Sequence, residues 1–334
     1  MAGGIHPVLY SPPGPGVSEA GIVGMTARYL SFSQYLRRRF GCRVYRVPLD
    51  AGFTCPTRDG ALSTGGCLYC DERGASSSDT GLPVREQLLK GIGTARRRHG
   101  AEKFIAYFQA FTGTYAPPGA LARIYAEGTD LPGVVGLAIG TRPDCAPEAV
   151  LDVIAPFAAR METWMEYGLQ SSHDATLRRV GRGHTAAEFA DAARRTGARG
   201  IKVCAHVIVG LPGETDEMVR ATARFIASLP VDGVKIHLLH VLRGSPLESM
   251  YREGGIALLS RDKYVDLACD FLELLPPTMV IQRLTGEAPP DRLVAPAWAL
   301  RKQEVLSAIR DELARRDSRQ GARWIPIPSP IGQT

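Results

Sequence analysis

Three of the seven cysteines in this 334-residue chain lie close together in a glycine-rich segment, GFTCPTRDGALSTGGCLYC (52–70). Eleven residues separate Cys55 from Cys67, and two separate Cys67 from Cys70. Three thiolates leave one cysteine unmatched in a disulfide framework and are one short of a closed four-cysteine zinc site. They suit a four-iron, four-sulfur cube in which one iron stays open to a small chelating molecule. The alternative is a structural zinc whose fourth ligand, such as a histidine, lies elsewhere in the chain.

The composition and the N-terminus indicate the cellular compartment of these cysteines. No run of eighteen apolar residues is present, so we expect no membrane-spanning segment. Residues 1–27 contain Pro and Gly but lack the basic and apolar parts of a signal peptide, and we expect a flexible leader. We therefore expect a cytoplasmic protein, in which clustered cysteines bind metals or do chemistry more often than they form disulfides. The other cysteines are predicted to be small buried hydrophobic residues: Cys42, Cys145, Cys204 and Cys269.

The charge balance is basic, with a net charge of +6 and an isoelectric point near 9.0. Arginines cluster at residues 37–39, 96–98 and 178–179. Such clusters suit an anionic partner, because each neutralised phosphate releases counterions. The alternative is a general compositional preference for Arg and Ala, which is visible along the whole chain. Charge alone does not decide between them.

Strand-like and helix-like segments alternate along the chain. Six strands, rich in β-branched and aromatic residues, are predicted at 42–50, 104–110, 134–140, 163–170, 201–210 and 233–241. Between them the apolar spacing predicts helices at 83–99, 118–127, 147–159, 186–197 and 213–229. A helix within 26–42 that ends at Gly41 comes before the first strand, and after the sixth come a helix at 261–275, a short strand near 279–284 and a basic helix at 299–316.

Repeated strand–helix units predict an α/β fold with a parallel sheet and right-handed crossovers. Six units are too few for a complete eight-unit barrel, so we predict an incomplete, open (β/α)6 barrel over 28–245, with the N-terminal helix included. An α/β extension (246–318) is expected to complete the side of the barrel, followed by a Pro-rich tail (319–334). In such folds chemistry occurs at the C-terminal ends of the strands, and the cysteine segment follows the first strand.

Several stretches, in chain order, resemble one family of enzymes. They are VPLDAGFTCPTRDG (47–60), YFQAFTGTYAP (107–117), GTRPD (140–144), GLQSSHDATLRRVGRGHT (168–185), KVCAHVIVGLPGET (202–215), KIHLLHVLRGSPL (235–247) and QRLTGEAP (282–289). Together with the cysteine spacing they resemble radical S-adenosylmethionine (SAM) proteins of the YhcC/YtqA-like family, which is related to the catalytic subunit of Elongator. The resemblance covers about 28–300. Thr57 stands where the family pattern has Asn, and all three cysteines are intact.

The resemblance implies a role for each of three groups of residues. Cys55, Cys67 and Cys70 would hold a [4Fe–4S] cluster whose open iron binds the amino and carboxylate groups of SAM. The backbone after the second strand would meet the SAM amino group, although QAFTG replaces the usual glycine-rich stretch here. The implied SAM contacts are Gln109, Ala110 and Thr112 after that strand, Gln170 and Ser171 at the ribose, Arg182 at the carboxylate, and Gly210 and Leu211 near the adenine.

Polar residues on the fifth and sixth predicted strands are candidates for a substrate pocket. His206 shares a strand face with Cys204 and Ile208, and Lys235 shares one with His237. Facing inward, they would contact substrate as proton donors or phosphate ligands, together with His240. A satisfied core histidine is the equal alternative for each, and we assign catalysis to none of them.

The resemblance also implies a reaction. One electron from the reduced cluster, supplied by a donor such as flavodoxin or ferredoxin, would cleave SAM to methionine and a 5′-deoxyadenosyl radical. The relation to Elongator implies a tRNA wobble uridine as substrate, and the chain has no room for an acetyltransferase domain. We therefore expect a reaction that uses no acyl-CoA, and the resemblance to the YtqA-like branch implies conversion of 5-carboxymethylaminomethyl-uridine to 5-aminomethyl-uridine.

Two other hypotheses stay open at this point. One is a radical SAM enzyme that acts on a small metabolite or a porphyrin-like substrate, since some of the same motifs resemble oxygen-independent coproporphyrinogen dehydrogenases. The other is a zinc-stapled RNA-binding module without catalysis. Metal content separates the zinc-stapled module, which would contain zinc, from both radical SAM hypotheses, which require iron and sulfide.

Overall fold

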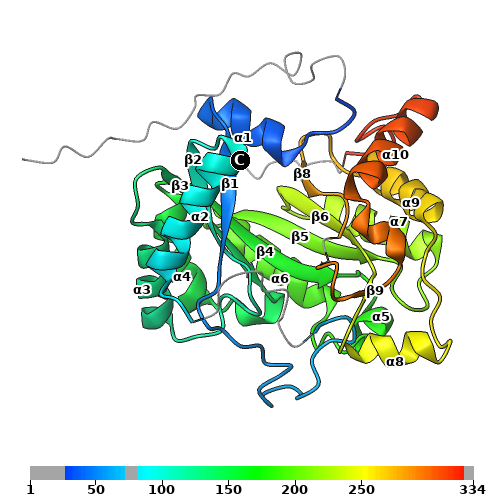
Figure 1. Cartoon of the computed structure of the whole chain (residues 1–334), viewed down its shortest axis with the longest axis horizontal. Coiled ribbons are helices and arrows are strands. Elements are labelled where there is room, and N and C mark those ends of the chain that lie inside the picture. The colour runs from blue at the N-terminus through cyan, green and yellow to red at the C-terminus, as the bar shows by residue number, and fades with distance from the viewer. Residues whose placement is uncertain (1–26, 72–80, 287, 327–334) are drawn as a thin grey trace, which may run out of the picture.

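The computed structural model describes residues 27–71, 81–286 and 288–326. The expected leader lies outside these residues except for its last position, as does the end of the expected tail (327–334). Seven parallel strands form one curled sheet in the order β1-β2-β3-β4-β5-β6-β8 (Figure 1). Their bounds are β1 Val44–Leu49, β2 Lys103–Phe108, β3 Val134–Thr141, β4 Glu162–Gln170, β5 Lys202–Val209, β6 Gly233–Leu238 and β8 Val280–Arg283.

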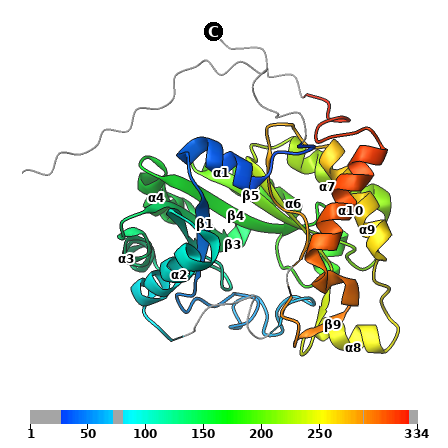
Figure 2. The ribbon, with the colours of Figure 1, turned by 45° about the horizontal axis from the view of Figure 1, so that its top comes forward.

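Helices cover the outer face of this sheet, as a half-barrel of βα units requires (Figures 1 and 2). They are α2 Val84–His99, α3 Pro118–Thr129, α4 Glu148–Ala158, α6 Ala186–Gly197, α7 Asp216–Ala227, α9 Arg261–Glu273 and α10 Lys302–Arg315. Shorter elements are α1 Phe32–Phe40, α5 Asp174–Arg179, α8 Pro246–Arg252, two 3-10 turns at Pro143–Cys145 and Ala297–Leu300, and an antiparallel pair, β7 Val241–Leu242 and β9 Leu293–Ala295. The predicted open barrel is confirmed.

The sheet differs from the prediction at its last strands. The short strand near 279–284 joins the barrel as a seventh parallel strand, because β8 pairs with β6 through Gly233 and Val280. The sixth strand ends at Leu238 rather than at residue 241. Val241 and Leu242 leave the barrel and pair with β9, where Val241 is buried against Leu247. The apolar run 233–242 is continuous in the sequence, but its first part belongs to the barrel sheet and its end to the two-stranded sheet.

Two helices start later than their apolar pattern predicted, and each start is set by a capping hydroxyl. Ser31 and Gln34 form a capping box, so α1 begins at Phe32 although the pattern extends further back. Thr215 accepts a hydrogen bond from the backbone N–H of Met218, and α7 begins at the next residue. Helices α5 and α8 were not predicted, because each is only about two turns long and lies between motif residues.

Helix α1 closes the end of the barrel opposite the cysteine segment, which Figure 1 shows at the other end of the strands. Leu36 packs with strand residues that point into the lumen, including Ile105, Ala138, Trp164 and Cys204. The ring of Phe32 meets Trp164 edge-on, with centroids 5.8 Å apart. The lumen therefore has an apolar layer at its N-terminal end that excludes water from below.

One carboxylate fixes α1 to this layer. Glu162, fully buried at the start of β4, accepts hydrogen bonds from the Tyr35 hydroxyl (2.7 Å) and the Trp164 indole (2.9 Å). Arg39 forms an ion pair with the same carboxylate at 2.6 Å, and Lys202 with a longer one at 3.5 Å. A buried carboxylate is tolerated only with such partners, so the polar contacts orient the helix and the aromatic contacts hold it.

We expect Trp164→Ala to lower the free energy of unfolding by about 3–5 kcal/mol, because it removes a fully buried indole and leaves a cavity. The partner Glu162 also loses one of its donors. Urea unfolding followed by circular dichroism measures the change. Leu89→Ala, on the exposed face of α2, is the control and should change stability by less than about 0.5 kcal/mol. Equal effects of the two substitutions would contradict the role of the apolar layer.

Candidate active site

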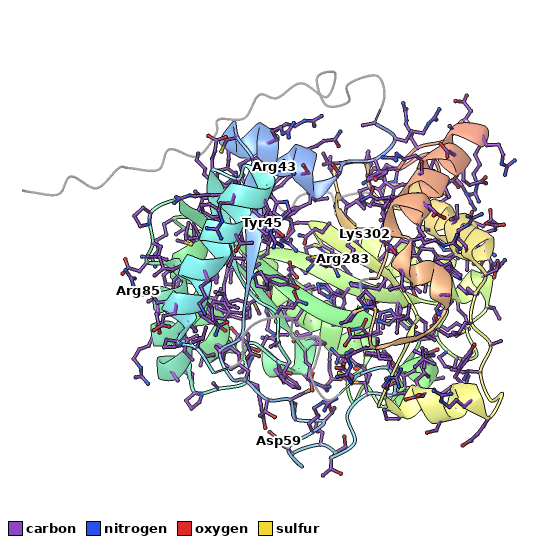
Figure 3. All side chains as sticks on the ribbon, viewed as in Figure 1. Arg43, Tyr45, Asp59, Arg85, Arg283 and Lys302 are labelled. Atoms are coloured by element: carbon purple, nitrogen blue, oxygen red, sulfur yellow. The ribbon has the colours of Figure 1, made fainter. Side chains whose placement is uncertain are left out.

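A cavity of about 740 Å³ occupies the lumen between the apolar layer and the C-terminal ends of the strands. Its lining includes Cys70 from the cysteine segment and residues of all seven barrel strands. Tyr45 on β1 and Arg283 on β8, both labelled in Figure 3, bring the two edge strands of the sheet to the same cavity. The site is thus built at the end of the barrel where α/β enzymes place their chemistry.

Tight turns shape the cysteine segment. The carbonyl of Cys55 accepts hydrogen bonds from the N–H groups of Arg58 and Asp59, at 2.8 and 3.1 Å. A second turn brings the N–H of Cys70 to the carbonyl of Cys67 at 3.0 Å. Because Cys55 and Cys67 are buried and Cys70 is half-buried, the three sulfurs are shielded from bulk water on the protein side. The predicted buried state of the other four cysteines is confirmed for two, whereas Cys42 and Cys145 are only half-buried.

Three arginines surround these thiols. Arg182 Nη1 lies 3.8 Å from the Cys67 sulfur, and Arg58 donates to the backbone carbonyl of Asp71 and, at 3.4 Å, to that of Cys70. Arg142, from the GTRPD stretch, is held by Asp144 through two hydrogen bonds of 3.0 and 2.8 Å. Guanidinium groups favour the thiolate form that an iron–sulfur cluster needs. The donor set and its charges therefore fit a [4Fe–4S] cluster.

The thiols differ in their acidity. Burial raises the pKa of the Cys55 thiol, but hydrogen bonds from Thr112 and Thr57 outweigh it, with help from the charge of Arg142, and the pKa is lowered. Burial raises the pKa of Cys70, and the neighbouring Cys67 adds to that rise.

Within the described residues, no three His, Cys, Asp or Glu side chains are grouped closely enough to hold a single metal ion.

Gly168 makes room for Arg182 at the end of β4. The carbonyl of Gly168 accepts hydrogen bonds from Arg182 Nε (3.1 Å) and Nη2 (2.9 Å), and His184 Nε2 lies 2.9 Å from the same oxygen. A Cβ on Gly168 would lie 2.4 Å from Arg182 Nη2, so any larger residue would push the guanidinium away. Burial and the adjacent Arg182 lower the pKa of His184 to about 3, which keeps the imidazole neutral. Arg182 is thus the charged member of this group.

The structure brings four of the predicted site residues to the cavity wall: Cys70, Gln109, Gln170 and Arg182. Gln170 has a left-handed backbone with φ of 71°, which is unusual for a residue with a side chain. A strained residue at a strand end is a common feature of binding sites. Ala110 and Thr112 are buried beneath the wall, and the Thr112 N–H is hydrogen-bonded to the Thr54 carbonyl at 3.2 Å.

Three further predicted residues lie beside the cavity rather than on its wall. Ser171 donates a hydrogen bond to Glu214, so its hydroxyl is engaged by the next motif. Gly210 has φ of 93° and lies against Leu259. Leu211 is buried in the apolar cluster that contains Val241 and Leu247. In this structure the GLPGE turn supports the wall through packing.

A buried network of charges forms the floor of the cavity. Glu166, fully buried on β4, forms ion pairs with Arg46 (3.1 Å) and with Lys235, and His206 Nε2 lies 3.1 Å from its carboxylate. The Lys235 ammonium also donates to the Tyr107 hydroxyl at 2.8 Å. These side chains come from β1, β2, β4, β5 and β6 and meet in the centre of the barrel. The inward direction hypothesised for His206 and Lys235 is therefore observed.

Burial sets the protonation of this network. Burial alone would raise the pKa of Glu166, but Arg46 and Lys235 outweigh it and hold the pKa well below its usual range. Burial lowers the pKa of Lys235 to about 7 against the opposing charge of Glu166. Burial and the Lys235 ammonium lower the pKa of His206 to about 4. The floor therefore contains a carboxylate, a neutral imidazole and a lysine that can exchange a proton near neutral pH.

The sequence analysis did not identify Glu166, Arg46 or Arg283 as site residues. Glu166 carried a usable signal, because it alternates with Trp164 and Gly168 on the inward face of a mostly apolar strand. A carboxylate at an inward position predicts a buried partner. Arg46 and Arg283 gave no such signal, since arginine is common throughout the chain.

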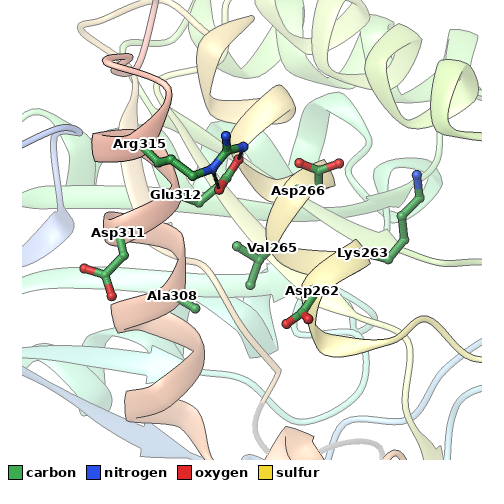
Figure 4. Close-up of a pocket in the computed structure, with 8 residues that line it drawn as sticks. All are labelled: Asp262, Lys263, Val265, Asp266, Ala308, Asp311, Glu312 and Arg315. Atoms are coloured by element: carbon green, nitrogen blue, oxygen red, sulfur yellow. Dashed lines mark hydrogen bonds and ion pairs between the residues drawn. The ribbon is translucent and has the colours of Figure 1, made fainter.

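A second cavity of about 620 Å³ lies between α9 and α10, which run side by side (Figure 4). Carboxylates line it from both helices: Asp262 and Asp266 on α9, and Asp311 and Glu312 on α10. Glu312 is already paired with Arg315 at 2.7 Å. Neither the cysteine segment nor any barrel strand contributes to the lining, so we assign the active site to the barrel lumen.

Comparisons with known proteins agree with this geometry. Two family models match the chain, the radical SAM superfamily over residues 63–226 and the Radical_SAM C-terminal domain over 231–315. YtqA of Bacillus subtilis is 41% identical over 298 residues, a match that covers 88% of this chain and 92% of the relative. YhcC of Escherichia coli is 34% identical over 300 residues, covering 88% and 96%. The chain belongs to the radical SAM superfamily.

Membership confirms the predicted family and makes the chain an enzyme that uses a [4Fe–4S] cluster and SAM. The archaeal Elp3 of Methanocaldococcus infernus shares the fold, with a TM-score of 0.65 at 17% identity, over 83% of this chain and 64% of the other. A tRNA uridine(34) acetyltransferase of Dehalococcoides mccartyi is 32% identical over 158 residues, which cover 46% of this chain and 34% of that protein. None of the helices in the described part of the chain has the length and apolar character of a membrane span.

Replacing any one of Cys55, Cys67 and Cys70 with Ala should abolish cluster binding, because two thiolates do not hold the cube. After anaerobic reconstitution, iron content should fall from about four per chain to less than about one, and the visible cluster absorption should disappear. Cys42→Ala, which lies outside the cavity lining, is the matched control and should keep both. A triad variant that retains full iron content would contradict this assignment.

Arg182→Lys should weaken SAM binding by about tenfold or more, because lysine keeps the charge but loses the planar fork that suits a carboxylate. Equilibrium dialysis of the cluster-loaded protein with SAM measures the change. Arg179→Lys is the control, since this exposed arginine contacts only the Pro212 carbonyl among the hydrogen bonds observed. Equal SAM affinity of the Arg182 variant and the unmodified enzyme would remove Arg182 from the SAM site.

Proposed function

We propose that this enzyme modifies the wobble uridine of tRNA and converts 5-carboxymethylaminomethyl-uridine to 5-aminomethyl-uridine. When bound, the cluster and SAM supply a 5′-deoxyadenosyl radical that abstracts hydrogen from an unreactive carbon. Cys55, Cys67 and Cys70 would hold the cluster, and Arg182 would hold SAM at the mouth of the lumen. Their positions leave the lower part of the cavity for the reacting group of the substrate.

The observation that carries the proposal is the partial match to a tRNA uridine(34) acetyltransferase, which covers 46% of this chain. The likeness to the archaeal Elp3 fold extends over more of the chain but is a likeness of fold alone. The match covers 34% of the acetyltransferase, so the proposal carries over the substrate position and not the acetyl transfer. The name of that acetyltransferase specifies uridine 34 of tRNA, and we take this position as the substrate of the proposed reaction.

The cavity supports an anionic substrate. Arg283 and Arg292 lie on its wall, and the network around Arg46 and Lys235 forms its floor. A single uridine that is turned out of its stack can reach such a lumen, whereas a duplex cannot. A basic chain with a net charge of +6 also favours association with RNA.

The proposed conversion balances with one SAM and one water. Hydrogen-atom abstraction breaks the C–H bond on the carbon between the nitrogen and the carboxylate. The substrate would then lose a second electron, which the cluster held by Cys55, Cys67 and Cys70 would accept, and a proton from the nitrogen, which would give an imine. Water hydrolyses this imine to the amine and glyoxylate. The substrate loses two electrons, and the cleavage of one SAM to methionine and 5′-deoxyadenosine takes up both.

The chain's own residues have defined tasks in this scheme. The apolar layer under the lumen excludes water from the radical, and the α1 helix keeps that layer closed. Lys235, with its pKa near 7, is placed to accept or return a proton at the floor. An external one-electron donor such as flavodoxin or ferredoxin would reduce the cluster before the first turnover, since each turnover returns the electron. A tRNA substrate implies a cytoplasmic location.

Anaerobic incubation of the reconstituted full chain with SAM, dithionite and tRNA from a strain that lacks this chain should test the reaction. Nucleoside mass spectrometry should show loss of 5-carboxymethylaminomethyl-uridine and gain of 5-aminomethyl-uridine. Glyoxylate and 5′-deoxyadenosine should form in about equal amounts, because one SAM removes the two electrons that one substrate loses.

Cys67→Ala serves as the matched control, since it removes the cluster and should stop all product formation. If 5′-deoxyadenosine forms while the wobble-uridine profile stays unchanged, the enzyme cleaves SAM but tRNA is not its substrate. If another uridine derivative forms, the tRNA assignment stands and the reaction assignment is wrong.

A further inference from the structure

A stacked aromatic pair stands at one edge of the barrel sheet. Tyr45, on the edge strand β1, is 36% exposed. Its ring lies flat on the imidazole of His99, the last residue of α2, with centroids 4.5 Å apart and 11° between the planes. Because Tyr45 is exposed and also lines the lumen cavity, the cavity reaches the molecular surface beside this pair.

The C-terminal ends of two helices meet at the start of the same strand. The carbonyl of Arg43, just before β1, accepts hydrogen bonds from the backbone N–H groups of Glu102 and Lys103, at 3.0 and 3.3 Å, shortly after α2 ends. The Lys103 ammonium donates to the carbonyl of Phe40, the last residue of α1, at 3.3 Å. The last turns of α1 and α2 therefore both lie close to Arg43 and Tyr45, which Figure 3 labels.

Exposed arginines dominate this part of the surface. The last turns contain Arg37–Arg39 in α1 and Arg96–Arg98 in α2, and all six are exposed, as is Arg43. The acidic residue closest to either cluster in the sequence is Glu102. The favourable interaction of cations with a helix C-terminus accounts for the basic last turns but not for Arg43, which precedes a strand. Within the described part of the chain, four of these arginines form no ion pair: Arg37, Arg43, Arg97 and Arg98.

The combination of an exposed aromatic pair and unpaired cations suits single-stranded RNA. Bases stack on aromatic rings, and guanidinium groups contact the phosphates on either side of them. Charge alone would suit an acidic protein equally well. The aromatic pair at the opening of the cavity favours RNA, because stacking there holds the strand beside the opening through which one nucleotide can enter.

We propose that Arg37, Arg43, Arg97, Arg98 and the Tyr45–His99 pair form a surface, the β1 rim, that binds the anticodon loop of the tRNA substrate. A base next to the modified uridine stacks on the aromatic pair, and the four arginines contact the loop phosphates. The uridine itself enters the lumen beside Tyr45. The choice of an anticodon loop rests on the proposed function, whereas the preference for single-stranded RNA rests on the residues of the rim.

Replacement of Tyr45 tests the stacking. Tyr45→Ala should weaken binding of a fluorescently labelled anticodon stem-loop to the cluster- and SAM-loaded enzyme by about 10- to 100-fold, the effect of one lost base–aromatic stack. Tyr45→Phe keeps the ring and should bind within about twofold of the unmodified enzyme. Tyr251→Ala, on α8 and also 36% exposed, is the matched control and should leave the affinity unchanged. Equal affinities of the Ala and Phe variants of Tyr45 would overturn the stacking role.

The salt dependence of binding tests the arginines. Arg43→Ala and Arg97→Ala should each lower the slope of log affinity against log salt concentration by about 0.7–0.9, because each removes one phosphate contact. Arg194→Ala is the control, since this exposed arginine lies on α6, which packs on β4 and β5. All variants should keep their iron and cleave SAM with dithionite as the unmodified enzyme does. Equal slopes for the Arg43, Arg97 and Arg194 variants would overturn the phosphate contacts.

Two further measurements separate this inference from the proposed function. Conversion of tRNA by an enzyme whose RNA affinity does not change in the Tyr45 and Arg97 variants would overturn the β1 rim alone. If tRNA is not converted, yet a short oligouridylate binds and Tyr45→Ala and Arg97→Ala weaken it, the proposed function fails and the rim stands as an RNA-binding surface. If both variants bind RNA normally but slow the reduction of the cluster by reduced flavodoxin, the rim binds an acidic protein and the RNA assignment is overturned.

Discussion

The ion cluster around Glu166 is the constraint on which the rest of the barrel depends. A carboxylate that is completely removed from water is stable only while its cationic partners stay in place, and loss of one partner from such a pair typically costs about 3–5 kcal/mol. Arg46 and Lys235 come from strands on opposite sides of β4. Their convergence on one carboxylate requires the sheet to curl, so the charge cluster and the half-barrel specify each other.

The two ends of the lumen differ in polarity and in access to water. At the N-terminal end, α1 and the ring of Trp164 exclude water, and Glu162 gives the helix a fixed orientation. At the other end the chain stays open, and the arginines near Cys67 supply positive charge where three thiolates gather. Between them the polarity changes within two strand residues, from an indole to a carboxylate. A radical reaction needs an end of the lumen that is closed to water, here the apolar layer, and an open, charged end at which the cofactors and the substrate enter.

The motif residues near the cysteines mainly hold one another in position through hydrogen bonds and close packing. Gly168 leaves space for Arg182, Arg142 donates to the carbonyl of Arg182 at 2.7 Å, and Ser171 is tied to Glu214. Motifs that are distant in the chain are therefore parts of one hydrogen-bonded wall. Motif residues can therefore act on the site without lining it, and only some of their side chains reach the cavity.

The sequence alone determined the open barrel, the cysteine segment at its mouth and the family, because strand periodicity, cysteine spacing and motif order are local properties of the chain. It also singled out Gln170 at the end of the fourth strand and Arg182 in the GRGH stretch, and both line the cavity in the structure. Only the tertiary structure decided that Arg46, Glu166 and Lys235 share one floor, because Arg46 and Lys235 are far apart in the chain and meet at the carboxylate of Glu166. It likewise moved Val241 out of the barrel, because burial against another sheet outweighs the continuity of an apolar run.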